Sequence, residues 1–379
     1  MSLFYQSFKL GVLGGGQLGR MLIQEAINYN LQVDIIDPDS NAPCKSLAHS
    51  FTQGSLTDYD TVMAFGRQCD LVTIEIENVN TEALAQLEKE GVTVYPQAQI
   101  IALIKNKVDQ KLFYRENSIP TAPFEIVNDK QDVAKTNLKL PFVNKLATEG
   151  YDGRGVQVIR NEADFDKAFD TNGLVEEFVD FDKEISVILA RNQQGEIKTF
   201  PTVELQFHPE HNLVEFLSTP ADISEEIDAK AKEVAIEVIT KLEMVGLLAV
   251  EMFVTNDGRV LVNEIAPRTH NSGHQTIESC TTSQFDQHLR AILGLPLGDT
   301  SLVIPAMMVN LLGEHGHTGP ARYEGLEEIV ALKGVYVHLY GKAITKPFRK
   351  MGHVTITGLG KESLVEKAKF VKETLKVKS

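Results

Sequence analysis

The chain has 379 residues, enough for two or three domains that each bury a core. Its formal net charge is −15 at pH 7 and its sequence pI is about 5.2, which argues against a nucleic-acid-binding surface. No apolar run reaches the length of a membrane span, the first residues lack a signal-peptide layout, and three scattered cysteines fit neither a disulfide framework nor a zinc knuckle. We therefore expect a cytoplasmic protein without membrane or nucleic-acid partners.

The first segment has the pattern with which dinucleotide-binding folds begin. Lys9–Leu13 is a predicted strand, and residues 14–19 read Gly-Gly-Gly-Gln-Leu-Gly before a predicted helix over 20–30. A second predicted strand over Gln32–Ile36 ends at Asp37, where such folds hold a ribose hydroxyl. Three interpretations stay open: NAD binding, a loop for the phosphate of a smaller substrate, and a tight turn that needs glycine for packing.

Polar side chains lie at the carboxyl end of the next predicted strand, Leu71–Ile76. They are Glu75, Glu77 and Asn78, and open α/β sheets bind ligands at this edge. A predicted helix over 82–90, a strand over 92–95 and a long helix over 98–117 follow. The long helix carries Lys105 and Lys107, and the prolines at 120 and 123 mark a domain boundary.

A glycine-rich loop lies between two further predicted strands, Phe142–Leu146 and Val156–Ile159. The first strand carries Lys145, and residues 148–155 contain three glycines. Such a loop, with a lysine before it, can close over a triphosphate as a lid. A hairpin with no ligand explains the same residues.

Acidic residues also mark the two strands that follow. The predicted strand Leu174–Val179 contains Glu176 and Glu177, and Glu184 is predicted to open the strand Ile185–Ala190. Carboxylates at strand ends beside a nucleotide can accept hydrogen bonds from ribose hydroxyls or an adenine amino group. The alternative is a set of solvated acids on edge strands.

A long amphipathic helix over 224–244 leads into a predicted hairpin of Ala249–Val254 and Val260–Ile265. Asp257-Gly258 has the composition of a two-residue type I′ turn, and in that register Glu251 faces Glu264. Facing like charges destabilise a sheet, and a hard divalent cation with oxygen ligands would relieve the repulsion. The alternative is an exposed sheet face on which both acids are solvated.

A dense polar run follows the hairpin at once: Arg268, His270, Asn271, Ser272 and His274. A cation site at a strand end beside such a loop indicates phosphoryl transfer. The spacing of the two histidines also matches a zinc pair, although the glutamate of the H-E-x-x-H motif is absent.

The tail forms a third predicted unit after a linker-like run at 294–298. Its predicted strands are Ala306–Leu311, Val335–Tyr340 and His353–Thr357, and a helix over 362–375 follows. The turn before the last strand carries four cations, Lys342, Lys346, Arg349 and Lys350. They could bind a substrate phosphate, or they could form a solvated basic hairpin.

Together, in chain order, seven motifs carry a family resemblance: GGGQLGRM, EIENV, EGYDGRG, EEFV, VEMFV, NEIAPRTHNSGH and GKAITKPFRKMGH. The chain resembles the 5-(carboxyamino)imidazole ribonucleotide synthases of the ATP-grasp superfamily. The resemblance implies an α/β, three-domain ATP-grasp fold: an N-terminal Rossmann-like parallel-sheet domain over 1–104, a central ATP-grasp domain over 105–298 with its lid near 120–190, and a small β-rich C-terminal domain over 299–379.

The resemblance also implies an activity, that of an ATP-dependent carbon–nitrogen ligase of purine biosynthesis. Its substrates would be ATP, bicarbonate and 5-aminoimidazole ribonucleotide, and its intermediate would be carboxyphosphate. Members of the family usually form homodimers and need Mg²⁺.

Motif by motif, the resemblance assigns roles to individual residues. The ATP site would comprise Lys107, Lys145, Gly150, Tyr151, Asp152, Gly153, Arg154, Gly155, Glu176, Glu177, Phe178, Val179, Glu184, His208, Asn263 and Glu264. Glu251 and Glu264 would bind Mg²⁺. The ribonucleotide site would comprise Gln17, Leu18, Glu75, Glu77, Asn78, Asn271, Ser272, Lys342, Arg349 and Lys350. Arg268, Tyr151, Asp152 and His274 would act in catalysis, with Arg268 orienting bicarbonate.

Three positions depart from the family pattern. Ala266 stands where many ATP-grasp enzymes have asparagine, so a water or Asn263 would complete the metal shell. Lys107 takes the place of a basic ATP contact that is often arginine, with Lys105 as its competitor. We place the single family histidine at His208, with His211 as the alternative.

Rival functions make different demands on these residues. A nicotinamide dehydrogenase would use the 14–19 loop and Asp37 but leaves the facing glutamates without a role. A non-catalytic nucleotide-binding module does not require the polar residues around Arg268. An ATP-grasp transferase that uses formate is the nearest rival enzyme, and Arg268 alone does not exclude it.

Overall fold

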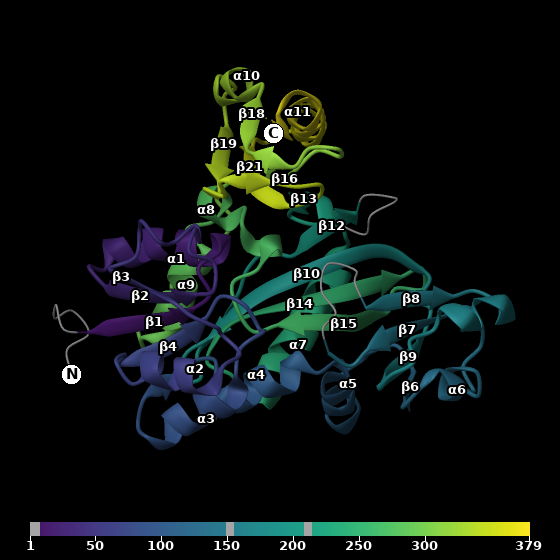
Figure 1. The fold of residues 1–379 in the computed structure, drawn as a ribbon. Coiled ribbons are helices and arrows are strands. Elements are labelled where there is room, and N and C mark those ends of the chain that lie inside the picture. The colour runs from purple at the N-terminus through teal and green to yellow at the C-terminus, as the bar shows by residue number, and fades with distance from the viewer. Residues whose placement is uncertain (1–7, 149–154, 208–213) are drawn as a thin grey trace.

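The computed structural model describes residues 8–148, 155–207 and 214–379. Within these residues the chain builds an N-terminal parallel sheet, a small antiparallel sheet and a large antiparallel sheet, with helices packed against them (Figure 1). The predicted α/β, three-domain ATP-grasp architecture is confirmed. None of the helices described is both long enough and apolar enough to cross a membrane.

The N-terminal sheet is parallel, with the strand order β3-β2-β1-β4-β5. Its strands are β1 (Lys9–Leu13), β2 (Gln32–Asp37), β3 (Ser50–Gln53), β4 (Leu71–Ile74) and β5 (Thr93–Val94). The helices are α1 (Gln17–Asn28), α2 (Tyr59–Gly66), α3 (Thr81–Lys89) and α4 (Ala98–Lys105). Successive residues of β1 face two layers, because Leu10 and Val12 pack with α1 while Leu13 packs with α2 and α3. The later helix α9 (Gln284–Ile292) joins α1 on its face of the sheet.

The long helix predicted over 98–117 is wrong in one respect, because the structure has two helices there. Asn106 separates α4 from α5 (Lys107–Glu116), and its side chain accepts hydrogen bonds from the backbone N–H of Val108 and Asp109. An asparagine that caps a helix satisfies amides that would otherwise lack partners. The break places Lys107 in the first turn of α5, and its backbone N–H donates to Ala147.

The central region combines two sheets. The small sheet has the order β6-β9-β7-β8, from β6 (Phe124–Val127), β7 (Phe142–Leu146), β8 (Val156–Ile159) and β9 (Gly173–Glu177), flanked by α6 (Lys130–Val133) and the 3-10 helix η1 (Glu162–Lys167). The strands β10 (Phe181–Arg191), β14 (Gly246–Thr255) and β15 (Val260–Ala266) begin the large sheet. Because β10 starts at Phe181, Glu184 lies inside the strand rather than at its opening as predicted.

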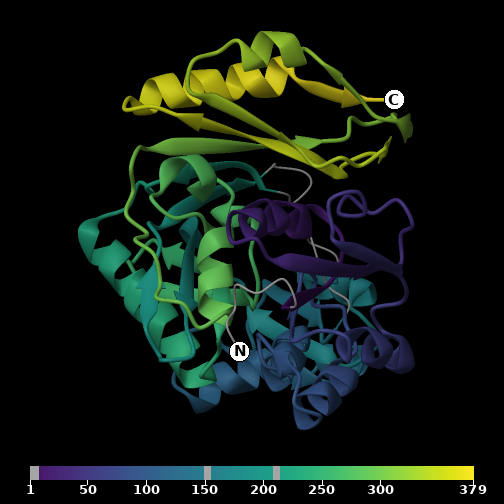
Figure 2. The same ribbon diagram turned by 90° about the vertical axis from the view of Figure 1, so that its left-hand side faces the viewer.

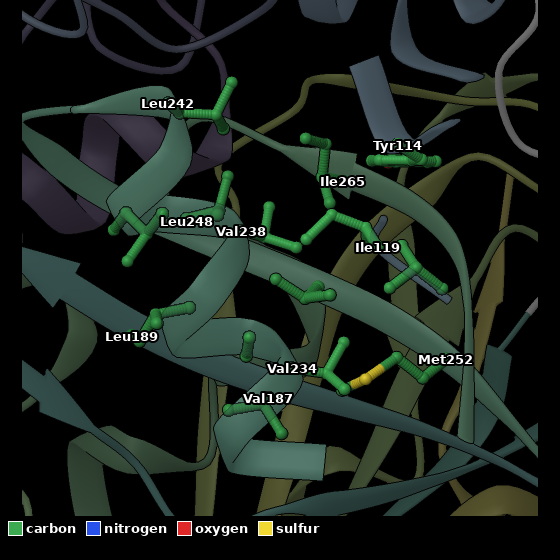
Figure 3. Packing of buried hydrophobic residues seen from close by; sticks show 14 of the residues in the cluster. Tyr114, Ile119, Val187, Leu189, Val234, Val238, Leu242, Leu248, Met252 and Ile265 are labelled. Carbon is green, nitrogen blue, oxygen red and sulfur yellow. The ribbon is translucent and has the colours of Figure 1, made fainter. Parts of the chain in front are cut away.

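Helix α7 (Glu225–Leu242) covers one face of these three strands (Figure 3). Its buried residues include Ala231, Val234, Val238 and Leu242, spaced three and four apart as the predicted amphipathic helix requires. They pack against buried side chains such as Leu248 on β14. The side chain of Ser224 accepts a hydrogen bond from Ile227 N and so begins the helix.

The large sheet continues without interruption into the C-terminal region. Its order is β15-β14-β10-β12-β13-β16-β21-β19, with β11 beside β10. The remaining strands of this sheet are β11 (Ile197–Thr199), β12 (Val203–Phe207), β13 (Val214–Thr219), β16 (Ala306–Leu312), β19 (Val335–Leu339) and β21 (Lys350–Thr357). Helix α11 (Lys361–Thr374) lies along the outer face of the C-terminal strands, as Figure 2 shows.

Short elements complete the C-terminal region and its connection. They are η2 (Asn271–Gly273), α8 (Thr276–Ser279), α10 (Leu326–Val330), and the pairs β17 (Gly319–Pro320) with β20 (Ile344–Thr345) and β18 (Arg322–Glu324) with β22 (Lys376–Lys378). Strand β21 begins three residues earlier than the predicted strand at His353, so Lys350 belongs to the strand.

Candidate active site

The β14–β15 hairpin confirms that Glu251 faces Glu264, although its turn differs from the prediction. Thr255 N donates to Arg259 O and Gly258 has φ +80°, so the loop has three residues rather than the predicted two. A β-bulge then restores the expected register, because Met252 pairs with Val262 while Glu251 pairs with Glu264. Asn263 is the extra residue.

The bulge turns two consecutive polar side chains to the same side of β15. Asn263 and Glu264 are partly exposed between the buried Val262 and Ile265, and both line one small pocket. Glu264 forms an ion pair with Lys107 of α5. The Glu264 carboxyl group and the Asn263 amide group thus share this pocket with Lys107 and Lys145.

The two facing glutamates hold different charges. Burial, Glu264 and Glu184 raise the pKa of Glu251 well above its usual range. The Lys107 ammonium holds the pKa of Glu264 at about 2. The Lys107 ammonium therefore balances the charge of Glu264, whereas Glu251 favours its protonated form. A divalent cation could replace either the ammonium or the proton.

The donor set fits Mg²⁺ in one particular way. Mg²⁺ is commonly bound by one or two protein carboxylates, with substrate phosphates and waters as the other ligands. Across residues 8–148, 155–207 and 214–379, no group of three or more acidic, histidine or cysteine side chains could hold a metal ion. Glu251 and Glu264 would therefore hold the ion together with phosphate oxygens.

A buried lysine cluster lies beside this pair. Lys145 of β7 donates to Asn263 Oδ1 at 3.1 Å and forms an ion pair with Glu176 of β9. Lys111 of α5 lies 2.7 Å from the other oxygen of Glu176. Sequence reasoning missed Lys111, although it follows Lys107 by four residues on one helix face, the spacing that brings helical side chains together. Lys107 lines the pocket, whereas Lys105 donates to Val79 O at 3.0 Å.

The other predicted ATP-site residues vary in their surroundings. The Glu184 carboxylate forms a hydrogen bond with the Asn263 side chain. Burial, and to a smaller extent the negative charge of Glu264, raises the pKa of Glu184 to about 7. Glu177 is exposed, and Phe178 and Val179 are partly exposed after β9. Six predicted residues lie outside the described residues: Gly150, Tyr151, Asp152, Gly153, Arg154 and His208. Of the glycine-rich loop at 148–155 only the two end residues, Thr148 and Gly155, are described, and the Gly155 carbonyl accepts a hydrogen bond from Leu146 N.

The glycine-rich turn at 14–19 holds carboxylates of the chain itself. Glu75 accepts a hydrogen bond from Leu18 N at 3.0 Å, and Asp37 accepts one from Gly15 N at 2.7 Å. A Cβ atom at Gly16 would lie 2.5 Å from Glu75 Oε1, so glycine allows this close approach. Two amides of the turn, Gly15 N and Leu18 N, are thus engaged by acids, which disfavours a dinucleotide phosphate there. Burial raises the pKa of Glu75 to about 7, against the opposing effects of Arg268 and Lys342.

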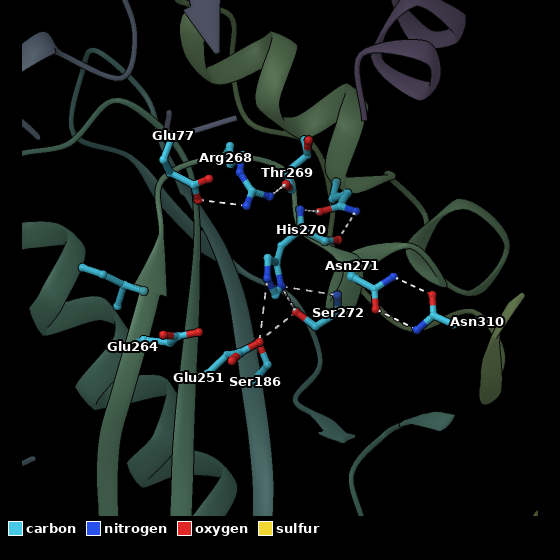
Figure 4. A network of polar contacts seen from close by, with 12 residues as sticks. Glu77, Ser186, Glu251, Glu264, Arg268, Thr269, His270, Asn271, Ser272 and Asn310 are labelled. Carbon is cyan, nitrogen blue, oxygen red and sulfur yellow. Dashed lines mark hydrogen bonds and ion pairs between the residues drawn. The ribbon is translucent and has the colours of Figure 1, made fainter. Parts of the chain in front are cut away.

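Arg268 connects the loop after β15 to the N-terminal domain. Its Nη2 lies 2.9 Å from Glu77 Oε1 and its Nη1 donates to Thr269 O at 3.0 Å (Figure 4). Two other residues of the predicted ribonucleotide site lie nearer the surface: Gln17 is partly exposed and Asn78 is exposed. The ion pair therefore brings Arg268, a predicted catalytic residue, next to Glu77, a predicted ribonucleotide-site residue.

The 3-10 helix η2 holds the polar loop in place. His270 Nδ1 lies 2.8 Å from Ser272 Oγ, while its Nε2 lies 3.7 Å from Glu251 Oε1 (Figure 4). Ser272 Oγ also lies 3.0 Å from Ser186 Oγ of β10. Because Ser272 is buried, its hydroxyl serves here to orient the His270 ring.

His274 lies in a buried ring cluster rather than on the surface of the site. Its Nδ1 accepts from the Gln284 amide at 3.1 Å, and its ring centre is 4.8 Å from that of His353. Burial holds the pKa of His274 well below its usual range, so the ring is neutral. His270 and His274 have separate partners, which does not support the zinc interpretation.

Two C-terminal cations lie close enough to act on the acids of the site. Lys342 lowers the pKa of Glu75 and Lys350 lowers that of Glu251, in both cases against burial. Lys342 Nζ also donates to Lys350 O at 2.7 Å. Arg349 Nη1 donates to Ile344 O at 2.6 Å within its own turn.

Comparisons with known proteins match three domain families in chain order. Residues 8–105 match the ribonucleotide synthetase preATP-grasp domain, and residues 112–285 match the ATP-grasp domain. Residues 306–367 match the phosphoribosylaminoimidazole carboxylase C-terminal domain.

Two relatives illustrate the sequence similarity. The N5-carboxyaminoimidazole ribonucleotide synthase of Bacillus subtilis is 38% identical over 361 residues, covering 93% of this chain and 92% of that protein. The chloroplastic phosphoribosylaminoimidazole carboxylase of Vigna aconitifolia is also 38% identical, over 364 residues and 94% of this chain. This chain spans only 65% of the length of the Vigna protein.

Solved structures show the same similarity. The crystal structure of N5-carboxyaminoimidazole ribonucleotide synthetase from Thermotoga maritima matches with a TM-score of 0.91 and 40% identity, covering 98% of this chain and 99% of that one. An Aspergillus clavatus synthase in complex with ADP and 5-aminoimidazole ribonucleotide matches with a TM-score of 0.88 and 33% identity, covering 97% and 98% of the two chains.

Proposed function

Since the chain belongs to the family of N5-carboxyaminoimidazole ribonucleotide synthases, ATP-grasp ligases of purine biosynthesis, we propose that it carboxylates 5-aminoimidazole ribonucleotide. The reaction consumes ATP and bicarbonate and releases ADP, phosphate and the N-carboxylated ribonucleotide. The Aspergillus structure holds ADP and the aminoimidazole ribonucleotide, which supports both ligands for this chain.

One observation carries the proposal beyond the family relationship. Two lysines from different regions, Lys107 of α5 and Lys350 of β21, both lower the pKa of Glu251 against burial. Its neighbour across the sheet, Glu264, faces the same pocket as Lys145. These contacts support the proposal that the acid pair lies where the γ-phosphoryl group of ATP is transferred to bicarbonate.

The first step joins bicarbonate to the γ-phosphoryl group of ATP. A bicarbonate oxygen attacks the γ-phosphorus and the bond from the γ-phosphorus to the β,γ-bridging oxygen breaks. ADP is the leaving group, and carboxyphosphate is formed and stays in the site. Bicarbonate is a weak nucleophile, so the chain contributes positioning and charge neutralisation. Lys107 and Lys145 would approach the phosphates, and Arg268 would hold the bicarbonate as a bidentate partner. Mg²⁺ on Glu251 and Glu264 would neutralise further phosphate charge.

The second step transfers the carboxyl group to the ribonucleotide. The exocyclic amine attacks the carboxyl carbon of carboxyphosphate, or carbon dioxide released from it, and phosphate leaves. Glu75 and Asp37 occupy the amides of the glycine turn, so the ribonucleotide phosphate would meet like charge there. We place that phosphate at Lys342, Arg349 and Lys350, and the aminoimidazole ring near Glu75. Exclusion of water, which protects carboxyphosphate, falls to the glycine-rich segment at 150–155.

Further properties are part of the same proposal. We infer a homodimer from the family, testable by light scattering coupled to gel filtration. We infer a cytoplasmic location because Cys44, Cys69 and Cys280 are free and buried, as is usual in a reducing compartment. The division at 1–104, 105–298 and 299–379 is our proposed domain assignment.

ADP release, measured with each acceptor and each one-carbon anion in turn, tests the function. We expect release that depends on both bicarbonate and 5-aminoimidazole ribonucleotide, with formate inactive. Oxygen-18 from labelled bicarbonate should appear in the released phosphate, because the attacking oxygen stays on phosphorus. Formate-dependent ADP release would instead identify a formate-using transferase.

A further inference from the structure

Lys111 is a buried cation that the proposed reaction leaves without a role. Its residue is 3% exposed, and its ammonium lies 2.7 Å from Glu176 Oε2 and 2.6 Å from Thr121 Oγ1. Thr121 donates in turn to Val262 O at 2.7 Å, and Val262 directly precedes Asn263 and Glu264. Lys111 thus connects α5 to both β9 and the strand that bears the facing glutamate.

Glu176 has two ammonium partners where one would balance its charge. Lys111 contacts one carboxylate oxygen and Lys145 contacts the other. Glu176 is only 4% exposed, and the two lysines lower its pKa to about 2 against the effect of burial. The carboxylate is therefore ionised and depends on both cations.

The two lysines differ in what else they touch. Both lysines line the pocket beside Glu264, but only the Lys145 ammonium also donates to Asn263 Oδ1, next to that glutamate. The Lys111 ammonium is instead anchored by its hydrogen bond to Thr121 Oγ1. If Lys145 were the sole partner of Glu176, drawing it toward ATP would leave a buried carboxylate without a counter-charge, which is strongly unfavourable.

We propose that Lys111 is a positioning residue for nucleotide binding: it keeps Glu176 paired, so that Lys145 is free to turn its ammonium to the ATP phosphates. Lys111 acts through Glu176 and does not touch the nucleotide. The inference rests on the proposed function, because it assumes that Lys145 meets ATP in this pocket.

Calorimetric titration with Mg·ADP tests the inference without any turnover. Lys111→Met should weaken Mg·ADP binding about tenfold, within the range of coupling energies between residues in contact. The KM for the ribonucleotide should stay within about twofold of wild type. Lys232→Met is the matched control, because it removes another lysine from an ion pair, 2.6 Å from Asp228 on α7, and should leave Mg·ADP binding unchanged.

A double-mutant cycle separates an indirect role from a direct contact. In the Glu176→Gln background the carboxylate that holds Lys145 is gone, so adding Lys111→Met should change Mg·ADP binding by less than about twofold. An undiminished tenfold loss in that background would mean that Lys111 contacts the nucleotide itself, which overturns the proposal. Lys111→Arg, which keeps the charge, should retain most of the affinity.

A purely structural role gives a different result. A lower melting temperature of Lys111→Met with unchanged Mg·ADP affinity would overturn the inference while leaving the proposed function intact. If Lys111→Met does not fold, Thr121→Val replaces it. This variant removes the hydrogen bond that anchors Lys111 and keeps the ion pair of Lys111 with Glu176. It should weaken Mg·ADP binding about threefold, and unchanged binding would again overturn the inference. Failure of the wild-type protein to bind Mg·ADP would contradict the proposed function itself.

Discussion

Asn271 and Asn310 exchange two hydrogen bonds between their side-chain amides, at 2.9 and 3.0 Å (Figure 4). Asn271 belongs to η2 beside the facing glutamates, and Asn310 belongs to β16 of the C-terminal region. Asn310 also donates to Val214 O at 2.9 Å. The pair therefore fixes η2 relative to β16, the strand that pairs with β21 and its Lys350.

Asn310→Ala should raise the KM for the ribonucleotide several-fold, because the loop and the basic turn lose their common anchor. Mg·ADP affinity should stay within about twofold. The partly buried Asn271 amide loses two partners, so the free energy of unfolding should fall by about 1–3 kcal/mol. Asn192→Ala is a matched control: Asn192 is buried and bonded to Glu196 and Leu295, away from the site. It should lower stability without changing the KM.

Glu264→Gln should abolish ADP formation while leaving the fold intact, because it removes one of the two carboxylates proposed to hold Mg²⁺. Normal magnesium-dependent turnover would contradict the metal assignment. Without magnesium the two glutamates should behave differently. Glu264→Gln loses the ion pair with Lys107 and should lower the melting temperature. Glu251→Gln removes a carboxyl whose pKa burial already raises, so it should raise the melting temperature at neutral pH.

NAD and NADP should not bind, because Glu75 and Asp37 engage the amides of the glycine turn. Calorimetric titration should show no saturable heat with either dinucleotide, whereas Mg·ADP should bind in the same experiment as a positive control. Saturable NAD binding in the micromolar range would reverse this prediction.

Arg349→Ala should raise the KM for the ribonucleotide about tenfold or more and leave the KM for ATP nearly unchanged. Loss of one charge-assisted contact to a phosphate is worth roughly 1.5–3 kcal/mol. Since the ground state and the transition state share the contact, kcat should fall less than kcat/KM. Lys346→Ala, an exposed cation in the same turn, is the control. Equal small effects of both variants on the two substrates would identify the turn as a solvated surface feature.

His288 should make the protein less stable as pH falls. Leu247 N donates to its Nδ1 at 3.2 Å, so Nε2 carries the proton and donates to Thr73 Oγ1 at 3.0 Å. Burial lowers the pKa of His288 from 6.5 to about 4. Between these pH values only the unfolded chain takes up the proton, so the free energy of unfolding should decrease as pH falls, by up to about 3 kcal/mol.

Urea unfolding between pH 6.5 and 4.5 checks this prediction. The chain has no tryptophan, so circular dichroism is the suitable signal. His288→Gln should show a smaller loss of stability over this range, because it lacks the buried imidazole. An identical pH dependence of the two proteins would contradict the assignment. His274 and His353, whose pKa values burial also lowers, contribute equally to both curves.

Local patterns in the sequence predicted most of the elements and the central acid pair. Strands β1, β7 and β8 have the predicted bounds. The facing of Glu251 and Glu264 was predicted correctly although two details were not, because the three-residue turn shifts the register by one position and the bulge at Asn263 shifts it back. Two adjacent polar residues, Asn263 and Glu264, in an otherwise apolar strand were the available signal for the bulge.

The remaining contacts depend on packing that periodicity does not encode. Thr73 and His288 are 215 positions apart, and Asn271 and Asn310 are 39 apart on different elements. The break at Asn106 interrupts an apolar pattern that would otherwise continue as one helix, and only the cap geometry reveals it. Glu75 in the glycine turn shows the same limit, since the motif predicts the backbone shape but not which anion fills it.

The pairing of β13 with β16 determines which parts of the site can change their separation. The strands that carry Glu184, Glu251, Glu264 and Lys350 belong to one hydrogen-bonded ladder, so bringing the basic residues closer to the acid pair would require bending or breaking that ladder. Lys145 and Glu176 lie on the separate small sheet, which among the described residues has no strand in common with the large one. Ligand-driven closure should therefore be a movement of the small sheet toward the large sheet, which carries both the acid pair and Lys350.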